Sequence, residues 1–538
     1  MTNRDYLLYE VDSVGNLKEL LQNASAKYGS HTAFTFKQSH ETTHVTYEQF
    51  KADVEALGTA LFDMGIRDAK VALIGENSYE WILSYFTTVN GGNVIVPLDK
   101  ELPLQDLTNL LINCQASVLI FSDDYRDIAD GLLNEQLNIK HKINIKYELK
   151  ALIKKGKELV TSDMSYVEYK IDRDKLATII YTSGTTGSPK GVMLSHKNIA
   201  RDVVISCQNI YFFGVSLLVL PLHHSFAFTG GVLIMMHWGC NIVINRSLKE
   251  LSDDLVTHKP NNILFVPLYI ETLYKKIWDS AKKSGKYNLL KTLINISNVL
   301  LRLGIDFRAK LFKQVLATFG GELDVLVTGG APIDSSYIKG FREFGVKVLN
   351  GYGISECSPV VSVNRNNYYR DGSVGLVLPS LEVNILEPDD TGCGEICVKG
   401  DIVMLGYYKN EQATKEAFDD GWFKTGDVGF LDQDGFLYIS GRKKNLIILS
   451  NGKNVYPEEL EFALLNHITY IKEALVYAED STIVAEIFMD TENKSGCVTC
   501  LNNDIVELNR TLPLYKNIGK TIIRNTEFSK TTTKKIKR

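Results

Sequence analysis

The stretch Tyr181-Thr-Ser-Gly-Thr-Thr-Gly-Ser-Pro-Lys190-Gly191 directly follows the apolar run 177–180. Its glycines let the backbone approach a ligand and turn N–H groups inward, while the hydroxyl groups and the lysine add donors and a positive charge. These features predict a loop that wraps a polyphosphate. The Walker A spacing G-x-x-x-x-G-K-[ST] is absent, which argues against a P-loop NTPase. An ordinary polar loop after a strand remains the alternative.

The longer string Thr178-Ile-Ile-Tyr-Thr-Ser-Gly-Thr-Thr-Gly-Ser-Pro-Lys-Gly-Val-Met-Leu-Ser-His196 resembles the phosphate-loop signature of the adenylate-forming enzymes. That superfamily contains acyl-CoA synthetases, carrier-loading adenylation domains and luciferases. The resemblance assigns nucleotide binding to a set of loop residues: Thr182, Ser183, Gly184, Thr186, Gly187 and Lys190. It assigns a catalytic and metal-binding role to Thr185.

Length and composition favour a multidomain protein that acts on small molecules. A chain of 538 residues is too long for one core. A net charge of −5 and a pI near 6.1 give no reason to expect nucleic-acid binding. The first residues contain early acidic side chains and no apolar signal segment, so we expect a cytoplasmic protein with at most peripheral membrane association.

One segment resembles a membrane span in its charge pattern, because no Asp, Glu, Lys or Arg lies between Asp202 and Arg246. Polar residues and the breakers Pro221, Gly230 and Gly231 divide it into shorter pieces. We therefore expect buried strands and a helix. The 8 scattered cysteines indicate reduced thiols. A zinc site built from Cys393, Cys397, Cys497 and Cys500 is disfavoured by the long separation between the two pairs.

Short apolar runs alternate with helical patterns along the first part of the chain. Strands are expected at 71–75, 93–97 and 116–121, with helices at 78–89 and 104–112, which predicts a doubly wound, largely parallel sheet. Thr46-Tyr-Glu-Gln49 has the form of a capping box. Residues 275–310 predict an amphipathic helical region that is interrupted near 280–286. After Asp401, short turns indicate an α+β region that ends near Arg442.

The block Asn350-Gly-Tyr-Gly-Ile-Ser-Glu356 places an aromatic ring between glycines and a carboxylate nearby. Tyr352 could stack on adenine, and Glu356 could bind Mg²⁺ on a triphosphate. The alternative is a strand end with a satisfied glutamate. The block resembles the aromatic-Gly-x-(Ser/Thr)-Glu motif of the superfamily, which has these roles. The glycine-rich positions that would complete the adenine pocket are Gly329, Gly330, Ala331, Gly351 and Gly353.

Two further blocks carry the resemblance toward the C-terminus. Trp422-Phe-Lys-Thr-Gly-Asp427 matches the block whose aspartate holds the ribose hydroxyls, a task that suits a two-oxygen acceptor. In Ser440-Gly-Arg-Lys-Lys444, Arg442 matches a nucleotide-contacting arginine and Lys444 matches a domain hinge. A solvated basic turn is the alternative.

Pro221-Leu-His-His-Ser225 lies in the uncharged segment. A lone buried histidine is commonly structural. His224, however, matches the histidine that lies between the acyl pocket and the phosphates in the superfamily. Phe226, Phe228 and Gly230 could line an apolar channel beside it.

The chain ends in Lys530-Thr-Thr-Thr-Lys-Lys-Ile-Lys-Arg538. Composition alone indicates a solvated basic tail or one that touches anionic lipid or RNA. The resemblance assigns Lys535 to charge neutralisation during attack on the α-phosphate. Lys534 stands where the superfamily usually has glycine, which could alter the geometry of this loop.

Together these blocks imply an α/β enzyme with two domains. The resemblance predicts an adenylation core over 1–443, built of layered α/β subdomains and a β-barrel-like region, and a small mobile α+β domain over 444–538. The expected reaction is AMP-forming acyl-CoA synthesis from a medium- or long-chain fatty acid, ATP and CoA, with Mg²⁺. Transfer to an acyl carrier protein is one alternative, and a catalytically weak acyl-nucleotide binding protein is another.

Overall fold

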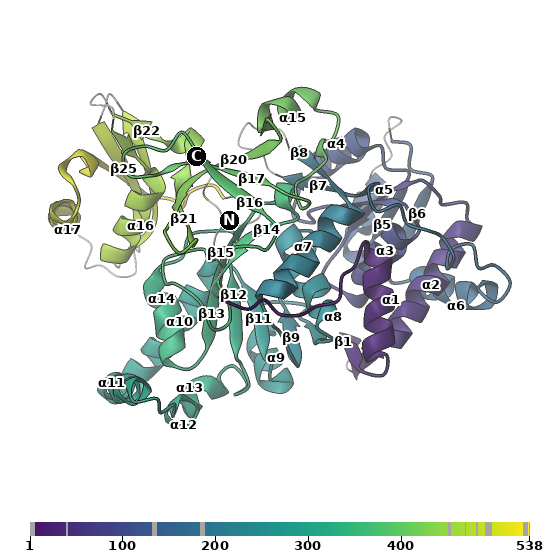
Figure 1. The fold of residues 1–538 in the computed structure, drawn as a ribbon, viewed down its shortest axis with the longest axis horizontal. Coiled ribbons are helices and arrows are strands. Elements are labelled where there is room, and N and C mark those ends of the chain that lie inside the picture. Colours follow the sequence, from purple (N-terminus) through teal and green to yellow (C-terminus); the bar gives the residue numbers. More distant parts are fainter. Residues whose placement is uncertain are drawn as a thin grey trace. The chain divides into compact units, whose positions relative to one another are not determined.

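The computed structural model describes residues 6–38, 41–131, 137–182, 189–449, 453–468, 470–479, 482–489, 498–530, 536 and 538. The chain forms two compact units (Figure 1). Unit 1 contains Met1–Glu382 and Lys399–Ala417, and unit 2 contains Val383–Val398 and Phe418–Arg538.

Unit 1 contains a seven-stranded sheet. In the spatial order given next, the first two pairs of neighbouring strands are antiparallel and the other four pairs are parallel. In spatial order the strands are β18 (Gly406–Tyr407), β8 (Lys190–Ser195), β7 (Leu176–Thr182), β4 (Val94–Pro97), β3 (Lys70–Ile74), β5 (Val118–Phe121) and β6 (His141–Asn144). The helix α2 (Tyr47–Asp63) precedes β3, and the helices between these strands are α3 (Tyr79–Asn90), α4 (Leu104–Cys114), α5 (Arg126–Gly131) and α6 (Leu149–Leu159).

A second sheet of unit 1 has nine strands with a parallel centre. In spatial order they are β15 (Leu376–Val377), β14 (Val360–Val363), β13 (Lys347–Gly353), β12 (Val325–Thr328), β11 (Asn262–Phe265), β9 (Val215–Leu218), β10 (Asn241–Ile244), β1 (Thr32–Gln38) and β2 (Glu41–Thr46). The remaining helices of unit 1 are α1 (Leu17–Tyr28), α7 (His196–Asn209), α8 (Ile234–His237), α9 (Leu251–His258), α10 (Pro267–Lys283), α11 (Tyr287–Arg302), α12 (Arg308–Leu311), α13 (Lys313–Ala317), α14 (Ser335–Glu343) and α15 (Glu411–Ala417). The predicted doubly wound, largely parallel α/β architecture is confirmed.

Local sequence signals explain where several helices begin. The Thr46 hydroxyl accepts from the backbone N–H of Gln49 at 3.2 Å, and the Gln49 side chain accepts from Thr46 N at 2.9 Å. This is the predicted capping box at the start of α2. Ser78 caps α3 by accepting from Trp81 N at 3.1 Å.

The uncharged segment 203–245 lies inside unit 1 and forms strands and helices, as expected. It comprises the end of α7, strands β9 and β10, a π-helical turn η2 (Phe226–Leu233) and α8. Most of its side chains are buried. Among the helices that the structure describes, none has both the length and the apolar character needed to cross a membrane.

Unit 2 contains a five-stranded sheet, and the β-barrel-like region that the resemblance implies stays a prediction. The strands of the sheet are β16 (Glu382–Leu386), β17 (Gly394–Lys399), β20 (Trp422–Leu431), β19 (Phe418–Asp419) and β21 (Leu437–Arg442). Two short strands then form a ribbon, β22 (Ile447–Ile448) and β23 (Asn454–Val455).

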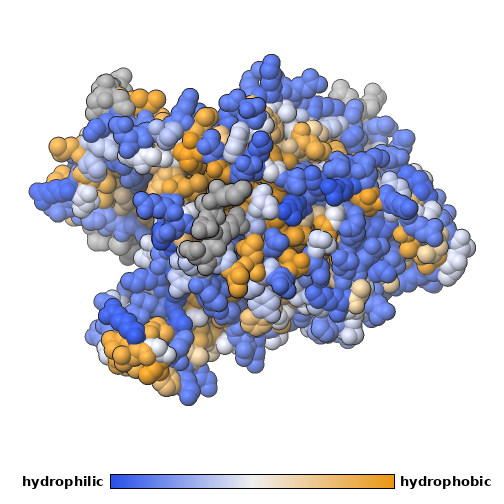
Figure 2. All heavy atoms as spheres, viewed as in Figure 1, coloured by the Kyte–Doolittle hydropathy of each residue, from blue (hydrophilic) through white to orange (hydrophobic). Residues whose placement is uncertain are grey.

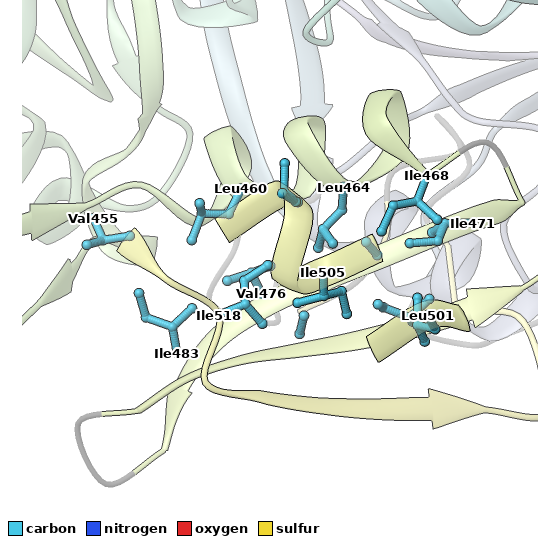
Figure 3. Close-up of a cluster of buried hydrophobic side chains, with 14 of the residues drawn as sticks. Val455, Leu460, Leu464, Ile468, Ile471, Val476, Ile483, Leu501, Ile505 and Ile518 are labelled. Atoms are coloured by element: carbon cyan, nitrogen blue, oxygen red, sulfur yellow. The ribbon is translucent and has the colours of Figure 1, made fainter. Parts of the chain in front are cut away.

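The rest of unit 2 is an α+β layer. A three-stranded sheet, β24 (Ile471–Glu479), β25 (Thr482–Met489) and β26 (Lys520–Arg524), packs with α16 (Pro457–His467) and α17 (Val498–Thr511). Figure 3 shows the shared core, in which Leu460, Leu464, Val476 and Leu501 are fully buried. This core confirms a small α+β C-terminal domain.

Unit 2 is larger than the C-terminal domain that the sequence predicts. It also includes 418–443, which the sequence assigned to the adenylation core. The predicted boundary at Lys444 is the hinge of a domain movement, and it stays a prediction.

Candidate active site

The predicted phosphate loop connects two paired antiparallel strands. Thr182 at the end of β7 faces Lys190 at the start of β8, and the Thr182 hydroxyl donates to Lys190 O at 3.5 Å. Ser183, Gly184, Thr185, Thr186 and Gly187 lie outside the described residues. A P-loop runs from a strand into a helix, so this strand-to-strand connection agrees with the rejection of Walker A.

Tyr407 contacts both Lys190 and Glu356. The Lys190 ammonium group is 4.9 Å from the ring centroid of Tyr407, which is a cation–π distance. The Tyr407 hydroxyl donates to Glu356 Oε1 at 2.9 Å. The predicted phosphate lysine and the predicted metal carboxylate are therefore brought together within unit 1.

A backbone hydrogen bond from another segment fixes the turn that carries Glu356. Glu356 belongs to a single 3₁₀ turn, η3 (Ser355–Cys357), and its carbonyl accepts from Met404 N at 2.8 Å. The segment 404–407 therefore holds both the main chain and the side chain of Glu356.

Sequence reasoning missed Tyr407. It lies 51 positions after Glu356, in a two-residue strand with no periodicity to find, and only the pairing of β18 with β8 brings it beside the loop.

His224 joins the same cluster from another loop. Its neighbour Ser225 lies 3.1 Å from Ser355 between the two hydroxyl oxygens, and Ser355 precedes Glu356. Asn77 holds this loop from two sides, since its side-chain amide donates to Leu220 O at 2.9 Å and its oxygen accepts from Leu222 N at 3.0 Å. Asn77 is a second residue that the sequence did not single out.

His223, the residue before His224, lies between the His224 ring and the Asp99 carboxylate. The two imidazole rings have centroids 4.0 Å apart. His223 Nε2 lies 3.6 Å from Asp99 Oδ1. Burial lowers the pKa of His223 to about 3, with a further contribution from His224. Burial therefore favours the neutral form of His223.

A narrow cavity of about 10 Å³ lies beside His224. Its walls include Tyr85, Ile180, Phe228 and Thr229. The rings of Tyr85 and Phe228 are in contact, with centroids 3.8 Å apart, so they close the apolar space. Phe228 thus lies where the sequence expected a channel wall, whereas Phe226 and Gly230 are not part of this lining.

The predicted adenine wall forms at the carboxyl ends of neighbouring parallel strands. β12 ends at Thr328, which pairs with Asn350 of β13, so the segments 329–331 and 351–353 lie side by side. A Cβ on Gly329 would meet Gly351 O at 3.0 Å, and Gly330 has a φ of +81° in open space. Tyr352 is half-buried in β13 beside them. Ligands in open α/β sheets bind outside such strand ends.

Unit 2 brings together the two residues that were expected to contact the rest of the nucleotide. Asp427 and Arg442 are strand partners in β20 and β21, and Arg442 Nε lies 2.8 Å from Asp427 Oδ1. The Asp427 side chain is buried, with 8% of its area exposed, so the guanidinium compensates a desolvated carboxylate.

Lys535 lies outside the described residues, but the chain on both sides of it is anchored in unit 2. Lys530 pairs with Ile536 as an isolated bridge and contacts Glu473. Arg538 makes two contacts with the Glu461 carboxylate, at 2.7 and 2.8 Å. Burial raises the pKa of Glu461 to about 7, and Arg538 opposes that rise.

Residues 21–408 match the AMP-binding enzyme family, which is more than half of the chain. The chain belongs to the AMP-binding enzyme family. It is 30% identical over 478 residues to the long-chain-fatty-acid–CoA ligase FadD15 of Mycobacterium bovis, covering 84% of this chain and 78% of that protein.

Two further comparisons agree with this membership. A chloroplastic long-chain-fatty-acid–[acyl-carrier-protein] ligase of Arabidopsis thaliana is 26% identical, covering 89% of this chain and 76% of that protein. The O-succinylbenzoate coenzyme A synthetase of Bacillus subtilis, solved with ATP and a magnesium ion, has a TM-score of 0.75 and 23% identity and covers 96% of this chain and 98% of that one. The fold is thus that of an adenylate-forming enzyme.

The donors in unit 1 suit a magnesium ion that arrives with ATP. One oxygen of Glu356 accepts from Tyr407, which leaves the other for a cation. Mg²⁺ typically binds through one or two carboxylates and the phosphates of its nucleotide. In the described part of the chain, no three His, Cys, Asp or Glu side chains gather as a metal cage, and every described cysteine is a free thiol. Cys497 lies outside the described residues.

Proposed function

We propose that this protein is an AMP-forming acyl-CoA synthetase for medium- or long-chain fatty acids. The observation that carries the proposal is the cluster in unit 1 that runs from Lys190 through Tyr407 to Glu356 and through Ser355 and Ser225 to His224. In this cluster Lys190 and Glu356 both contact Tyr407, which supports their proposed roles toward phosphate and metal, and His224 lines the apolar cavity. The relative named as a fatty-acid–CoA ligase supports the choice of substrate.

The reaction has two displacements. A carboxylate oxygen of the acid attacks the α-phosphorus of ATP, the bond to the β-phosphate oxygen breaks, and acyl-AMP and pyrophosphate form. The CoA thiol then attacks the acyl carbonyl carbon, loses its proton and expels AMP. Mg²⁺, when bound with ATP, neutralises phosphate charge and makes pyrophosphate a better leaving group.

The residues divide this work by position. Lys190 would face the phosphates, and Glu356, held by Tyr407, would orient the metal end of the triphosphate. The glycine-lined strand ends and Tyr352 would receive adenine, and Asp427 would accept from the ribose hydroxyls. Lys535 would neutralise charge that develops at the α-phosphate.

The deciding experiment is pyrophosphate release from ATP with acids of increasing chain length, followed by product analysis with CoA or with a holo acyl carrier protein. We expect pyrophosphate release that depends on the chain length of the acid, and we expect an acyl-CoA product. Loading of the carrier alone would favour the second candidate, which the named activity of the Arabidopsis relative supports. Nucleotide binding without pyrophosphate release would leave a binding protein. The free thiols of the described cysteines support a reducing cytoplasmic setting.

A further inference from the structure

The helical segment Pro267–Ala317 has an apolar surface that its own unit does not cover. α11 buries one side, with Leu290, Ile294 and Ser297 turned into the protein. A second row of apolar side chains on the same helix is exposed. We call it the outer stripe: Leu289, Ile296, Val299 and Leu303.

The spacing of the outer stripe makes it one continuous face. Its members are seven, three and four residues apart, which is the repeat of neighbours on one side of a helix. Val299 is 56% exposed and Leu303 is 69% exposed. Ile305 and Phe307, in the turn after the helix, extend the patch and are also exposed. In Figure 1, α11 and α12 lie away from the sheets, and Figure 2 shows apolar surface at the place of α11.

The same segment is strongly basic, although the chain as a whole carries −5. It has ten cations against the three carboxylates Glu271, Asp279 and Asp306. The cations are Lys275, Lys276, Lys282, Lys283, Lys286, Lys291, Arg302, Arg308, Lys310 and Lys313. In the described ion pairs only Arg308 is within 4 Å of a carboxylate, Asp306 at 2.7 Å. The other nine cations have no carboxylate within 4 Å among the described ion pairs, and Lys286 donates instead to the Gln314 side chain at 3.2 Å.

Cationic and apolar groups are interleaved in space. The Lys310 ammonium lies 5.6 Å from the centroid of Phe307, whose ring is half exposed. Lys282 and Lys291 lie 5.8 and 5.1 Å from the Tyr287 ring. An apolar helix face flanked by lysines is the pattern of helices that lie in the interface of an anionic bilayer. A soluble acidic partner would use the charges but would leave the outer stripe in water.

We propose that α11 and the following turn dock this protein on anionic membrane surfaces, with the outer stripe in the headgroup region and the flanking lysines on lipid phosphates. Docking at this face is separate from the chemistry and does not rest on the proposed function. For an enzyme of fatty acids, it would place unit 1 where its substrate partitions.

The test is sedimentation of the full-length protein with vesicles, without ATP or acid. We expect binding to vesicles of phosphatidylcholine with phosphatidylglycerol, weak binding to phosphatidylcholine alone, and loss of binding at high salt. Val299→Asp with Leu303→Asp should lower the partition coefficient by about tenfold or more. Lys310→Gln should lower it by about fivefold.

A matched control separates this face from exposed apolar residues in general. Val256 on α9 is 55% exposed, like Val299, but stands beside Asp253 and Asp254. Val256→Asp should bind vesicles as the original protein does. All variants should keep the far-UV circular dichroism spectrum and the thermal unfolding midpoint of the original protein, which shows that they fold.

Three outcomes would overturn the proposal. The original protein could stay in the supernatant with anionic vesicles. Val299→Asp with Leu303→Asp could bind as well as Val256→Asp. The protein could form a stable dimer in solution that Val299→Asp dissociates, in which case a second copy covers the outer stripe.

Discussion

Tyr407 shows how one side chain outside every recognised motif can order two groups within them. Its hydroxyl donates to Glu356 at 2.9 Å and its ring lies below the Lys190 ammonium. A carboxylate without a hydrogen bond would sample several rotamers. If Glu356 binds the metal as proposed, this contact would reduce the entropy lost when MgATP binds.

Replacing Tyr407 with phenylalanine should weaken the use of Mg²⁺ and ATP while leaving the fold intact. A hydrogen bond to a charged group contributes roughly 1.5–3 kcal/mol, so we expect a rise of about tenfold to a hundredfold in the MgATP concentration for half-maximal pyrophosphate release. Tyr408→Phe is the control, because the Tyr408 hydroxyl donates to Gln115 at 3.3 Å and not to the cluster. Equal MgATP dependence in the two variants would remove Tyr407 from the site.

Lys535 carries the second prediction at this scale. Lys535→Ala should lower acyl-AMP formation by about 10²-fold or more, because a cation that faces developing phosphate charge is lost. Thioester formation from supplied acyl-AMP should be largely kept. Lys534→Ala, at the position where the superfamily has glycine, should retain both steps. If Lys535→Ala reduced both steps equally, its role would be in folding or closure.

At the scale of elements, the narrow cavity beside η2 would limit which acids can enter if the acyl chain binds there. Phe228 is 4% exposed and contacts Tyr85 across the space. A channel for a long acyl chain therefore requires this pair of rings to separate, or the acid to approach from another side of His224.

Phe228→Ala should enlarge the space and shift the preference among acids toward longer or bulkier chains. The change should also lower the free energy of unfolding by about 3–5 kcal/mol, as for other buried phenylalanines. Phe341→Ala, in the core of the nine-stranded sheet, should lower stability without changing the preference. Ratios of kcat/KM for a chain-length series measure the effect, and an unchanged series in Phe228→Ala would place the acyl site elsewhere.

His196, at the first position of α7, links stability to pH. Burial lowers its pKa to about 4, and Asp172 opposes this only in part. In the unfolded chain the imidazole of His196 has a pKa near 6.5, so below that pH the unfolded chain binds a proton that the folded protein does not. The free energy of unfolding is therefore unaffected above about pH 6.5 and falls as the pH falls toward 4.

His196→Gln should therefore flatten the acid side of the stability profile. Between pH 7 and 4.5 we expect the original protein to lose on the order of 2 kcal/mol more than the variant. Urea unfolding at both pH values measures the difference, with His31→Gln as an exposed control. Parallel profiles for all three proteins would contradict the assignment.

At the scale of the whole molecule, two half-reactions must use one acyl group. A lysine against the α-phosphate and a pantetheine thiol cannot occupy the same approach at once, which is the geometric reason to expect a domain movement. The predicted hinge, Lys444, lies in the short 3₁₀ turn Lys443–Asn445 and is exposed.

Lys444→Pro should affect the two half-reactions unequally, because proline fixes φ and removes a backbone donor. Lys444→Ala removes the same side chain without that restriction and should leave both steps near normal. Pyrophosphate release and thioester formation from supplied acyl-AMP are measured separately. Equal loss in both steps, or full activity in both, would count against a hinge at Lys444.

Where a structural pattern lies within a few neighbouring residues, the amino-acid sequence by itself determined the secondary structure. The capping box of α2, the strands and helices around 71–121 and the interrupted helix near 280–286 depend on neighbours a few positions away. The family also followed from contiguous motifs, because each nucleotide-contacting loop is a short segment with its own glycines and charges.

Only the tertiary structure decided how those motifs meet. Tyr407 reaches Glu356 through the pairing of β18 with β8, Arg442 reaches Asp427 through a hairpin, and Tyr85 meets Phe228 across two layers. The outer stripe of α11 belongs here too, since the sequence shows a helix that is apolar on much of its surface but not which side is buried. The physical reason is that periodicity and motif spacing report chemistry along the chain, whereas contacts between distant residues depend on strand register and side-chain packing.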